Sequence, residues 1–330
     1  MTSSEYDNNT ISETFDYYFV SMSPTLRIWL MIAIDVVSLA CSLTVLYQMF
    51  TKKVLRESLN NHTFIALTFT GLGTQLIDVP FYVNYLRLGY VWPSTPLSCL
   101  IWWYVDIGLF EATMMLVAWA SLERHILVFH ERWLSTDVRR YLFHYFPIMI
   151  VAIYPLLFTL FCLIFITCDD AFVFNYSNAW CGFSPCFYRD TLLSLYDTMM
   201  HWVLPNIVIL FLNLTLIIRV IWHRSIRLRQ PIRWRKHRKM LIQLLSISIV
   251  FIFFNLPVDT YYILMFFKVL PEDVNPQIYA YFYLICYLPV LLMPLFVLFS
   301  MPKEYWWNIW KEFFFNRQQR RQIATTNIAM

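Results

Sequence analysis

The sequence is poor in charge and in glycine. Of its 330 residues, 14% are charged and only 5 are glycine, whereas 59% are hydrophobic and 19% are aromatic. Soluble domains carry about 25% charged residues, so this composition excludes an ordinary soluble globular protein. The mean hydropathy of +0.54 points the same way. We therefore interpret the chain as an integral membrane protein.

Lys and Arg are absent from the first 25 residues, which contain several acids instead. A secretory signal peptide begins with a basic region, so we expect no cleavable signal and a first span that acts as its own insertion signal. Seven apolar runs follow, and each is long enough to cross a bilayer. They lie at 27–50, 62–86, 98–128, 144–167, 192–222, 240–267 and 275–299.

Basic residues gather in alternate loops. Lys and Arg concentrate after the first, third and fifth runs and in the C-terminal tail, whereas the opposite side holds only Arg27, Arg87, Arg189 and Lys268. Basic loops stay in the cytosol, so the N-terminus is predicted outside and the C-terminus inside. The expected organisation is an extracellular tail at 1–26, a seven-span domain at 27–300 and a cytoplasmic segment at 301–330.

Candidate sites of covalent modification fall on the predicted outer side. The sequons that begin at Asn8 and Asn175 are candidate glycosylation sites. Four cysteines lie at the same face, which is an oxidising compartment, and we expect disulfide bonds there. These cysteines are Cys99, Cys168, Cys181 and Cys186.

The third apolar run begins at Cys99 and ends in Glu123-Arg124-His125. A cysteine and an arginine at this spacing, within seven spans, resemble the third span of class A (rhodopsin-like) G-protein-coupled receptors. Three prolines sit where that family kinks its fifth, sixth and seventh spans, namely Pro205, Pro257 and Pro294. The resemblance covers roughly residues 27–315. It implies an all-α seven-transmembrane helix bundle at the plasma membrane, with an amphipathic eighth helix.

The resemblance also implies roles for individual residues. Cys99 would bond to Cys181 or Cys186, and the remaining outer cysteines could pair with each other. Arg124 would be held by Glu123 in the inactive receptor and released to contact a heterotrimeric G protein. The chain departs from the family pattern at several places, including Gly71 where a sodium-binding aspartate is usual, so we expect a divergent member.

Intramembrane acids suggest the ligand. Asp106 occupies the position at which amine receptors carry the aspartate that pairs with the ligand's ammonium group, and Tyr287 aligns with a tyrosine that supports it. Asp197, Asp259 and Tyr283 align with ligand-facing positions. Carboxylates around one cavity would favour a cationic ligand, and tyrosines could add cation–π contacts. An extracellular amine and a basic peptide both remain open.

The same acids allow other interpretations, because buried carboxylates are costly and need a reason. They could be structural, bonded to His201, tyrosines or water. They could also form the ion path of a channel or transporter. Further intramembrane acids are Asp35, Asp78 and Glu111. We expect no enzyme activity, no metal site and no cofactor, since only one histidine lies well inside a span on the outer side and no nucleophile elbow or phosphate loop is present.

Two cytosolic segments predict contacts with lipid and protein. Residues 219–239 hold nine Lys or Arg and no acid. They are expected to attract anionic membrane lipids and to help dock a G protein, rather than to bind nucleic acid. Residues 303–315 combine regularly spaced aromatic residues with flanking bases, a pattern typical of an interfacial helix on the inner leaflet.

Overall fold

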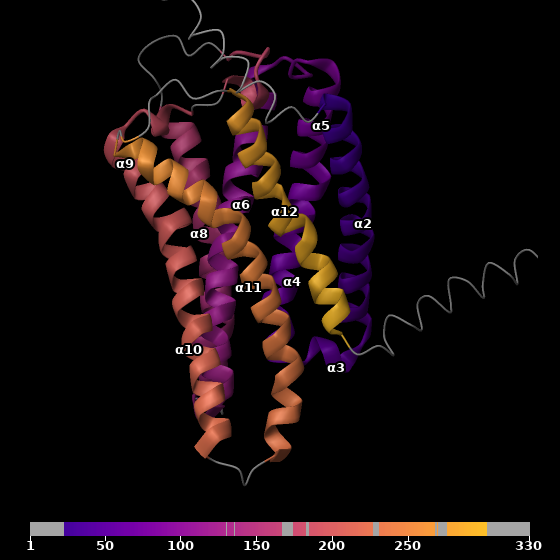
Figure 1. The fold of residues 1–330 in the computed structure, drawn as a ribbon, viewed down its shortest axis with the longest axis vertical. Coiled ribbons are helices and arrows are strands. Elements are labelled where there is room, and N and C mark those ends of the chain that lie inside the picture. Colours follow the sequence, from indigo (N-terminus) through magenta and orange to yellow (C-terminus); the bar gives the residue numbers. More distant parts are fainter. Residues whose placement is uncertain are drawn as a thin grey trace, which may run out of the picture.

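The structure is a computed structural model that describes residues 23–129, 131–134, 136–166, 174–182, 185–226, 231–267, 269 and 276–301. Within these ranges the chain forms a bundle of long helices that run side by side (Figure 1). Predictions outside the described residues include the sequon at Asn8, the pairing of Cys168, the basic residues at 227–230 and the helix at 303–315.

Every predicted apolar run forms helix. The first three spans are α2 (Pro24–Thr51), then α4 (Leu59–Gly73) with η1 (Thr74–Asp78) and α5 (Val79–Leu88), then α6 (Pro96–Phe129). The fourth comprises α7 (Asp137–Arg140), η3 (Tyr141–Tyr145) and α8 (Phe146–Phe165). The fifth comprises α9 (Thr191–Asp197), η6 (Thr198–Val203) and α10 (Leu204–Ile226). The last two are α11 (Pro231–Phe266) and α12 (Pro276–Ser300). Short helices in the connections are α3 (Lys53–Arg56), η2 (Glu131–Leu134), η4 (Ala179–Gly182) and η5 (Cys186–Tyr188).

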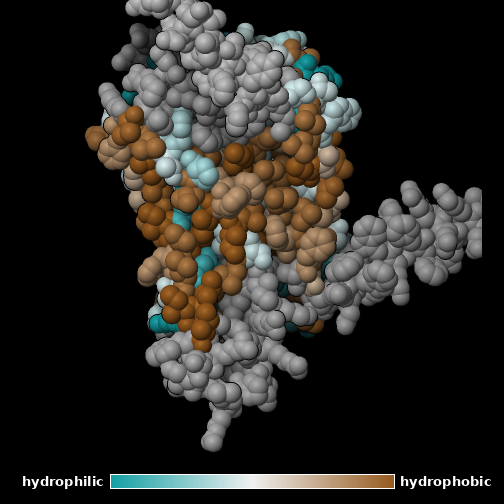
Figure 2. Space-filling model, in the orientation of Figure 1, coloured by the Kyte–Doolittle hydropathy of each residue, from teal (hydrophilic) through white to brown (hydrophobic). Residues whose placement is uncertain are grey.

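The outside of the bundle is apolar, as a membrane-spanning protein requires. Among the described residues, the first five spans are long and apolar enough to cross a bilayer, and Leu245–Tyr261 and Leu284–Phe299 are shorter apolar stretches of the last two. Large hydrophobic side chains are exposed along the helices, for example Trp29 and Phe211. Figure 2 shows this hydrophobic surface over the middle of the bundle.

Three spans contain a wide π-helical turn just before a proline. These turns, η1, η3 and η6, end at Asp78, Tyr145 and Val203, two residues before Pro80, Pro147 and Pro205. Proline has no N–H to donate, and its ring clashes with the carbonyl four residues earlier. A wider turn makes room for the ring while most of the backbone stays hydrogen-bonded.

The third span, α6, contacts α4, α8, α10 and α11. The core around it has two parts. Near Arg124 it is built mainly from aliphatic and Phe side chains such as Phe64, Leu67 and Phe251. Toward the other end, which carries Cys99, it is rich in Trp and Tyr. We call these ends the Arg124 end and the disulfide end (bottom and top in Figure 1).

The divergent position Gly71 is closely packed. A Cβ atom added there would lie 3.2 Å from Met293 Cε and 3.6 Å from Val290 Cγ1, both on α12. Apolar side chains therefore fill the space that the family's aspartate would occupy. Nearby, Gln75 ties η1 to α2, because it accepts from Ser42 Oγ at 3.0 Å and donates to Ser38 Oγ at 2.8 Å.

Candidate functional site

A disulfide bond anchors the loop segment 174–182 at the disulfide end of the bundle. It joins Cys99 to Cys181, one of the two partners that the resemblance implied, with Cα atoms 5.9 Å apart. Cys186 is disulfide-bonded as well. Trp180, the residue before Cys181, is buried, and its carbonyl accepts a hydrogen bond from Trp103 Nε1 at 2.7 Å. The disulfide bond and this hydrogen bond together hold the backbone at Trp180 against α6.

Aromatic side chains surround two carboxyl groups beneath that loop. Tyr82 stacks on Trp180 with ring centroids 5.1 Å apart, and Trp102 lies 5.5 Å from the same indole. Asp78 in η1 accepts a hydrogen bond from Trp102 Nε1 at 2.8 Å. Tyr82, Trp102, Trp180, Asp78, Asp106 and Tyr287 form what we call the aromatic cage.

The two carboxyl groups of the cage are not equally satisfied. The Tyr287 hydroxyl lies 2.9 Å from Asp78 Oδ1 and 3.5 Å from Asp106 Oδ1. A hydroxyl has one proton to donate, so the shorter contact with Asp78 takes it. Asp78 thus receives two donors on one oxygen and is almost completely buried, whereas Asp106 is only partly buried. Asp106 also has Asp78 and Trp180 as hydrogen-bonding neighbours, and it is the less buried of the two adjacent cage acids.

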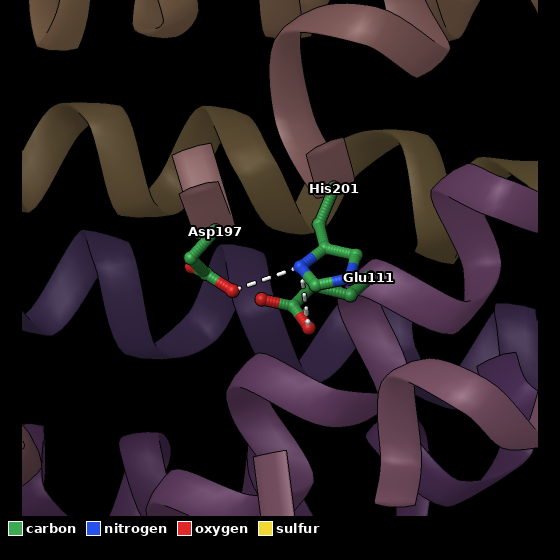
Figure 3. A group of neighbouring side chains, drawn as sticks. All are labelled: Glu111, Asp197 and His201. Carbon is green, nitrogen blue, oxygen red and sulfur yellow. Dashed lines mark hydrogen bonds and ion pairs between the residues drawn. The ribbon is translucent and has the colours of Figure 1, made fainter. Parts of the chain in front are cut away.

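The other predicted ligand-binding acids have different partners. Asp197 Oδ1 pairs with His201 Nδ1 at 2.8 Å, and Glu111 of α6 lies beside them (Figure 3). Asp259 of α11 accepts a hydrogen bond from Asn206 of α10. The side chain of Tyr283 lies outside the described residues, so its contact with a ligand stays a prediction.

At the Arg124 end, Glu123 is held by other spans. Its carboxylate accepts a hydrogen bond from Thr63 at 2.5 Å and pairs with His144 Nδ1. His144 Nε2 lies 2.9 Å from His62 Nδ1, and His62 Nε2 lies 2.9 Å from the carbonyl of Arg56. The acid of the Glu123-Arg124-His125 motif thus bonds to the second and fourth spans, whereas the resemblance implied a bond to Arg124.

Arg124 is completely buried and has no polar partner in the described part of the chain. None of its three guanidinium nitrogens is hydrogen-bonded, and the group lies over the Phe64 ring at 5.1 Å from the centroid. A cation–π contact recovers only part of the cost of burying a charge. The neighbouring His125 bonds through Nε2 to the carbonyl of Leu212 at 2.7 Å and so ties α6 to α10.

The predicted kink prolines lie inside long helical segments. Pro257 is within α11 and Pro294 within α12, while Pro205 follows η6. The described helices also contain Pro155 and Pro289. Asn175, a predicted glycosylation site, is exposed at the disulfide end, and its Oδ1 accepts from Ser177 N at 3.1 Å.

Several site residues were given no specific role by the sequence. Asp78 and Glu111 appeared only as intramembrane acids, and His144 and Trp180 were not singled out. Asp197 and His201 are four residues apart and therefore share one helix face, which is a usable signal. Glu111, His144 and Trp180 meet their partners across helices or from a loop, and no local spacing in the sequence encodes such contacts.

The comparison with known families agrees with this architecture. Residues 42–296 match the family described as 7 transmembrane receptor (rhodopsin family). The match spans most of the chain, so the protein belongs to this family of seven-transmembrane receptors and is a multi-pass membrane protein. A search of curated proteins found no match.

Proposed function

We propose that the protein is a plasma-membrane receptor, with its N-terminus outside, that binds an extracellular cationic ligand and activates a heterotrimeric G protein. The aromatic cage is the observation that supports a cationic ligand. Its two carboxyl groups attract a cation, and its Tyr and Trp rings can contact that cation through their faces. We assign the protein no catalytic activity.

Asp106 is the proposed counter-ion of the ligand. Asp78 already accepts from Trp102 and Tyr287, so its Oδ1 is satisfied within the protein. Asp106 is less buried than Asp78, and its contact with the shared Tyr287 hydroxyl is the longer one, at 3.5 Å. An ammonium or guanidinium group would add charged donors to the neutral ones that surround Asp106. Amines and basic peptides both carry such a group.

The buried Arg124 supports the proposed coupling to a G protein. A guanidinium with no hydrogen-bond acceptor among the described residues gains most from acceptors that another molecule brings. Backbone carbonyls of an inserted G-protein segment would provide them once the sixth span moves aside. Glu123 is hydrogen-bonded to Thr63 and His144, so it acts on the arginine through charge attraction and not through a hydrogen bond.

The test is G-protein activation in cells challenged with biogenic amines and basic peptides. We expect Asp106→Asn to raise the half-maximal ligand concentration more than about 100-fold, because the ligand's charge loses its partner. Asp35→Asn, which alters a half-buried carboxylate of α2 outside the cage, is the matched control and should respond as wild type. Surface expression is measured for each variant.

Three results would contradict the proposal. An unchanged response in Asp106→Asn would remove Asp106 from the ligand site. Silence across the library at normal surface expression would argue against a cationic ligand. Ligand-independent ion currents that vanish in Asp106→Asn would favour a channel or transporter instead.

A further inference from the structure

A second cluster of ionisable side chains lies away from the aromatic cage, between α6 and the fifth span. Glu111, Asp197 and His201 are all essentially inaccessible to solvent. Each offers one nitrogen or oxygen, and these atoms lie within 4.8 Å of one another. His201 Nδ1 is 2.8 Å from Asp197 Oδ1 and 3.7 Å from Glu111 Oε2 (Figure 3).

Each carboxylate of the cluster is already oriented by a hydroxyl. Thr159 Oγ1 of α8 donates to Glu111 Oε2 at 3.3 Å, and the Tyr188 hydroxyl donates to Asp197 Oδ2 at 3.0 Å. Trp202 is a further polar neighbour of Glu111. Outer hydrogen bonds of this kind fix the orientation of metal ligands in known sites.

Two polar atoms of the cluster, Glu111 Oε1 and His201 Nε2, lack a hydrogen-bond partner among the described residues. Glu111 Oε1 is buried and accepts no hydrogen bond from any described residue. Figure 3 shows this oxygen on the side that faces the Asp197 carboxylate. Two carboxyl groups that face each other in a dry interior need either a shared proton or a positive group between them, because burying uncompensated charge is costly. His201 alone approaches both acids from one side.

From these contacts we propose that Glu111, Asp197 and His201 bind a divalent zinc ion that bridges α6 and the fifth span. Zinc takes imidazole nitrogen and carboxylate oxygen at about 2.0–2.2 Å, so neighbouring ligands of a tetrahedral site lie about 3.3 Å apart. His201 Nδ1 lies 2.8 Å from the Asp197 oxygen and 3.7 Å from the Glu111 oxygen, and 3.3 Å falls between these two distances. Three protein ligands leave a fourth position for water. Calcium and magnesium prefer larger sets of oxygen ligands.

The ion would cross-link α6 to the fifth span. It would therefore oppose any movement of these two spans relative to each other. Glu111 comes from α6, whereas Asp197 and His201 come from the end of α9 and from η6. Rings of Phe158 and Tyr154 pack against His201, with centroids 4.9 and 5.4 Å from the imidazole, and shield the cluster. Zinc is therefore expected to stabilise the bundle and to change its response to ligand.

Zinc binding can be measured on the full chain in lipid nanodiscs after chelation with EDTA. Isothermal titration should give one tight site, and zinc at a hundred times its Kd should raise Tm by about 5 °C. His201→Asn should weaken binding by more than about 100-fold, because it removes a direct ligand. Asp259→Asn, at a buried carboxylate outside the cluster, should bind as wild type.

A second variant keeps the proposal testable if His201→Asn folds poorly. His201→Cys replaces nitrogen by a thiolate, which also binds zinc and favours softer metals such as cadmium. With Co²⁺ in place of Zn²⁺, this variant should show a thiolate-to-metal charge-transfer band that wild type lacks. An absent band, an equal isotherm for wild type and His201→Asn, or no zinc effect on wild type would overturn the proposal.

Discussion

Asp78 near the disulfide end and Arg124 at the opposite end are both buried ionisable groups, yet their surroundings differ. Asp78 accepts hydrogen bonds from Trp102 and Tyr287, which belong to the third and seventh spans. Arg124 has the face of Phe64 and no acceptor within the described residues. A satisfied buried group adds to the rigidity of its site, whereas an unsatisfied one stores free energy. The disulfide end is thus preorganised, and the Arg124 end is poised to change.

Asp78→Ala removes the buried acceptor at the preorganised disulfide end and should have the largest effect on stability. It leaves the Trp102 N–H and the Tyr287 hydroxyl without an acceptor, and each stranded donor costs about 1–3 kcal/mol. We expect the free energy of unfolding to fall by about 2–4 kcal/mol. Asp78→Asn keeps an acceptor oxygen and should cost clearly less. Thermal unfolding followed by tryptophan fluorescence measures both, and equal Tm values would contradict this account.

Arg124→Met tests the Arg124 end of the bundle and should raise the stability that Asp78→Ala lowers. Replacing an unpaired buried charge by an apolar side chain of similar length should raise the free energy of unfolding by about 1–3 kcal/mol. The same change should abolish G-protein activation at normal surface expression. Arg139→Met, on the exposed part of α7, is the control and should shift stability by less than about 0.5 kcal/mol. A fall in Tm for Arg124→Met would show that the arginine is satisfied.

Two glycines test how rigid the disulfide end is, and their substitution should have a smaller effect on stability. Gly182 and Gly89 both have positive φ, +92° and +77°, so alanine is strained at either position. A Cβ on Gly182 would also lie 2.9 Å from Asn175 Cβ, whereas nothing lies within 4 Å at Gly89. We expect Gly89→Ala to cost about 1 kcal/mol and Gly182→Ala about 1 kcal/mol more. Equal unfolding midpoints for the two variants would mean that the loop around Cys181 relaxes freely.

The sequence predicted the architecture well because the relevant signals are local. Each apolar run became a helix, and the distance from Cys99 to Arg124 located the third span correctly. Cys181 was one of two possible partners for Cys99, since spacing alone does not choose between cysteines on one loop. Chain direction and apolar length are properties of a single segment, so they can be predicted without knowledge of packing.

The contacts that define the sites depend on how helices face one another. Glu123 was expected to bond to its neighbour Arg124, but it bonds to Thr63 and His144, which are distant in sequence. Asp197 was grouped with Asp106 and Asp259, yet its nearest charged partners are His201 and Glu111. These pairings follow from the rotation of each helix about its axis, and a single sequence fixes that rotation only loosely.

The wide turns before Pro80, Pro147 and Pro205 affect how a residue of this chain is matched to the equivalent position in another receptor. A π-helical turn closes its hydrogen bonds one residue later than an α-helical turn and so accommodates one extra residue. Each residue of an α-helix accounts for about 100° of rotation. Counting back from Pro205 to Asp197 crosses η6, so a position assigned by that count points about a quarter-turn away from its equivalent in a regular helix. Insertions of one residue, which alignments treat as minor, here decide which carboxylate faces which neighbour.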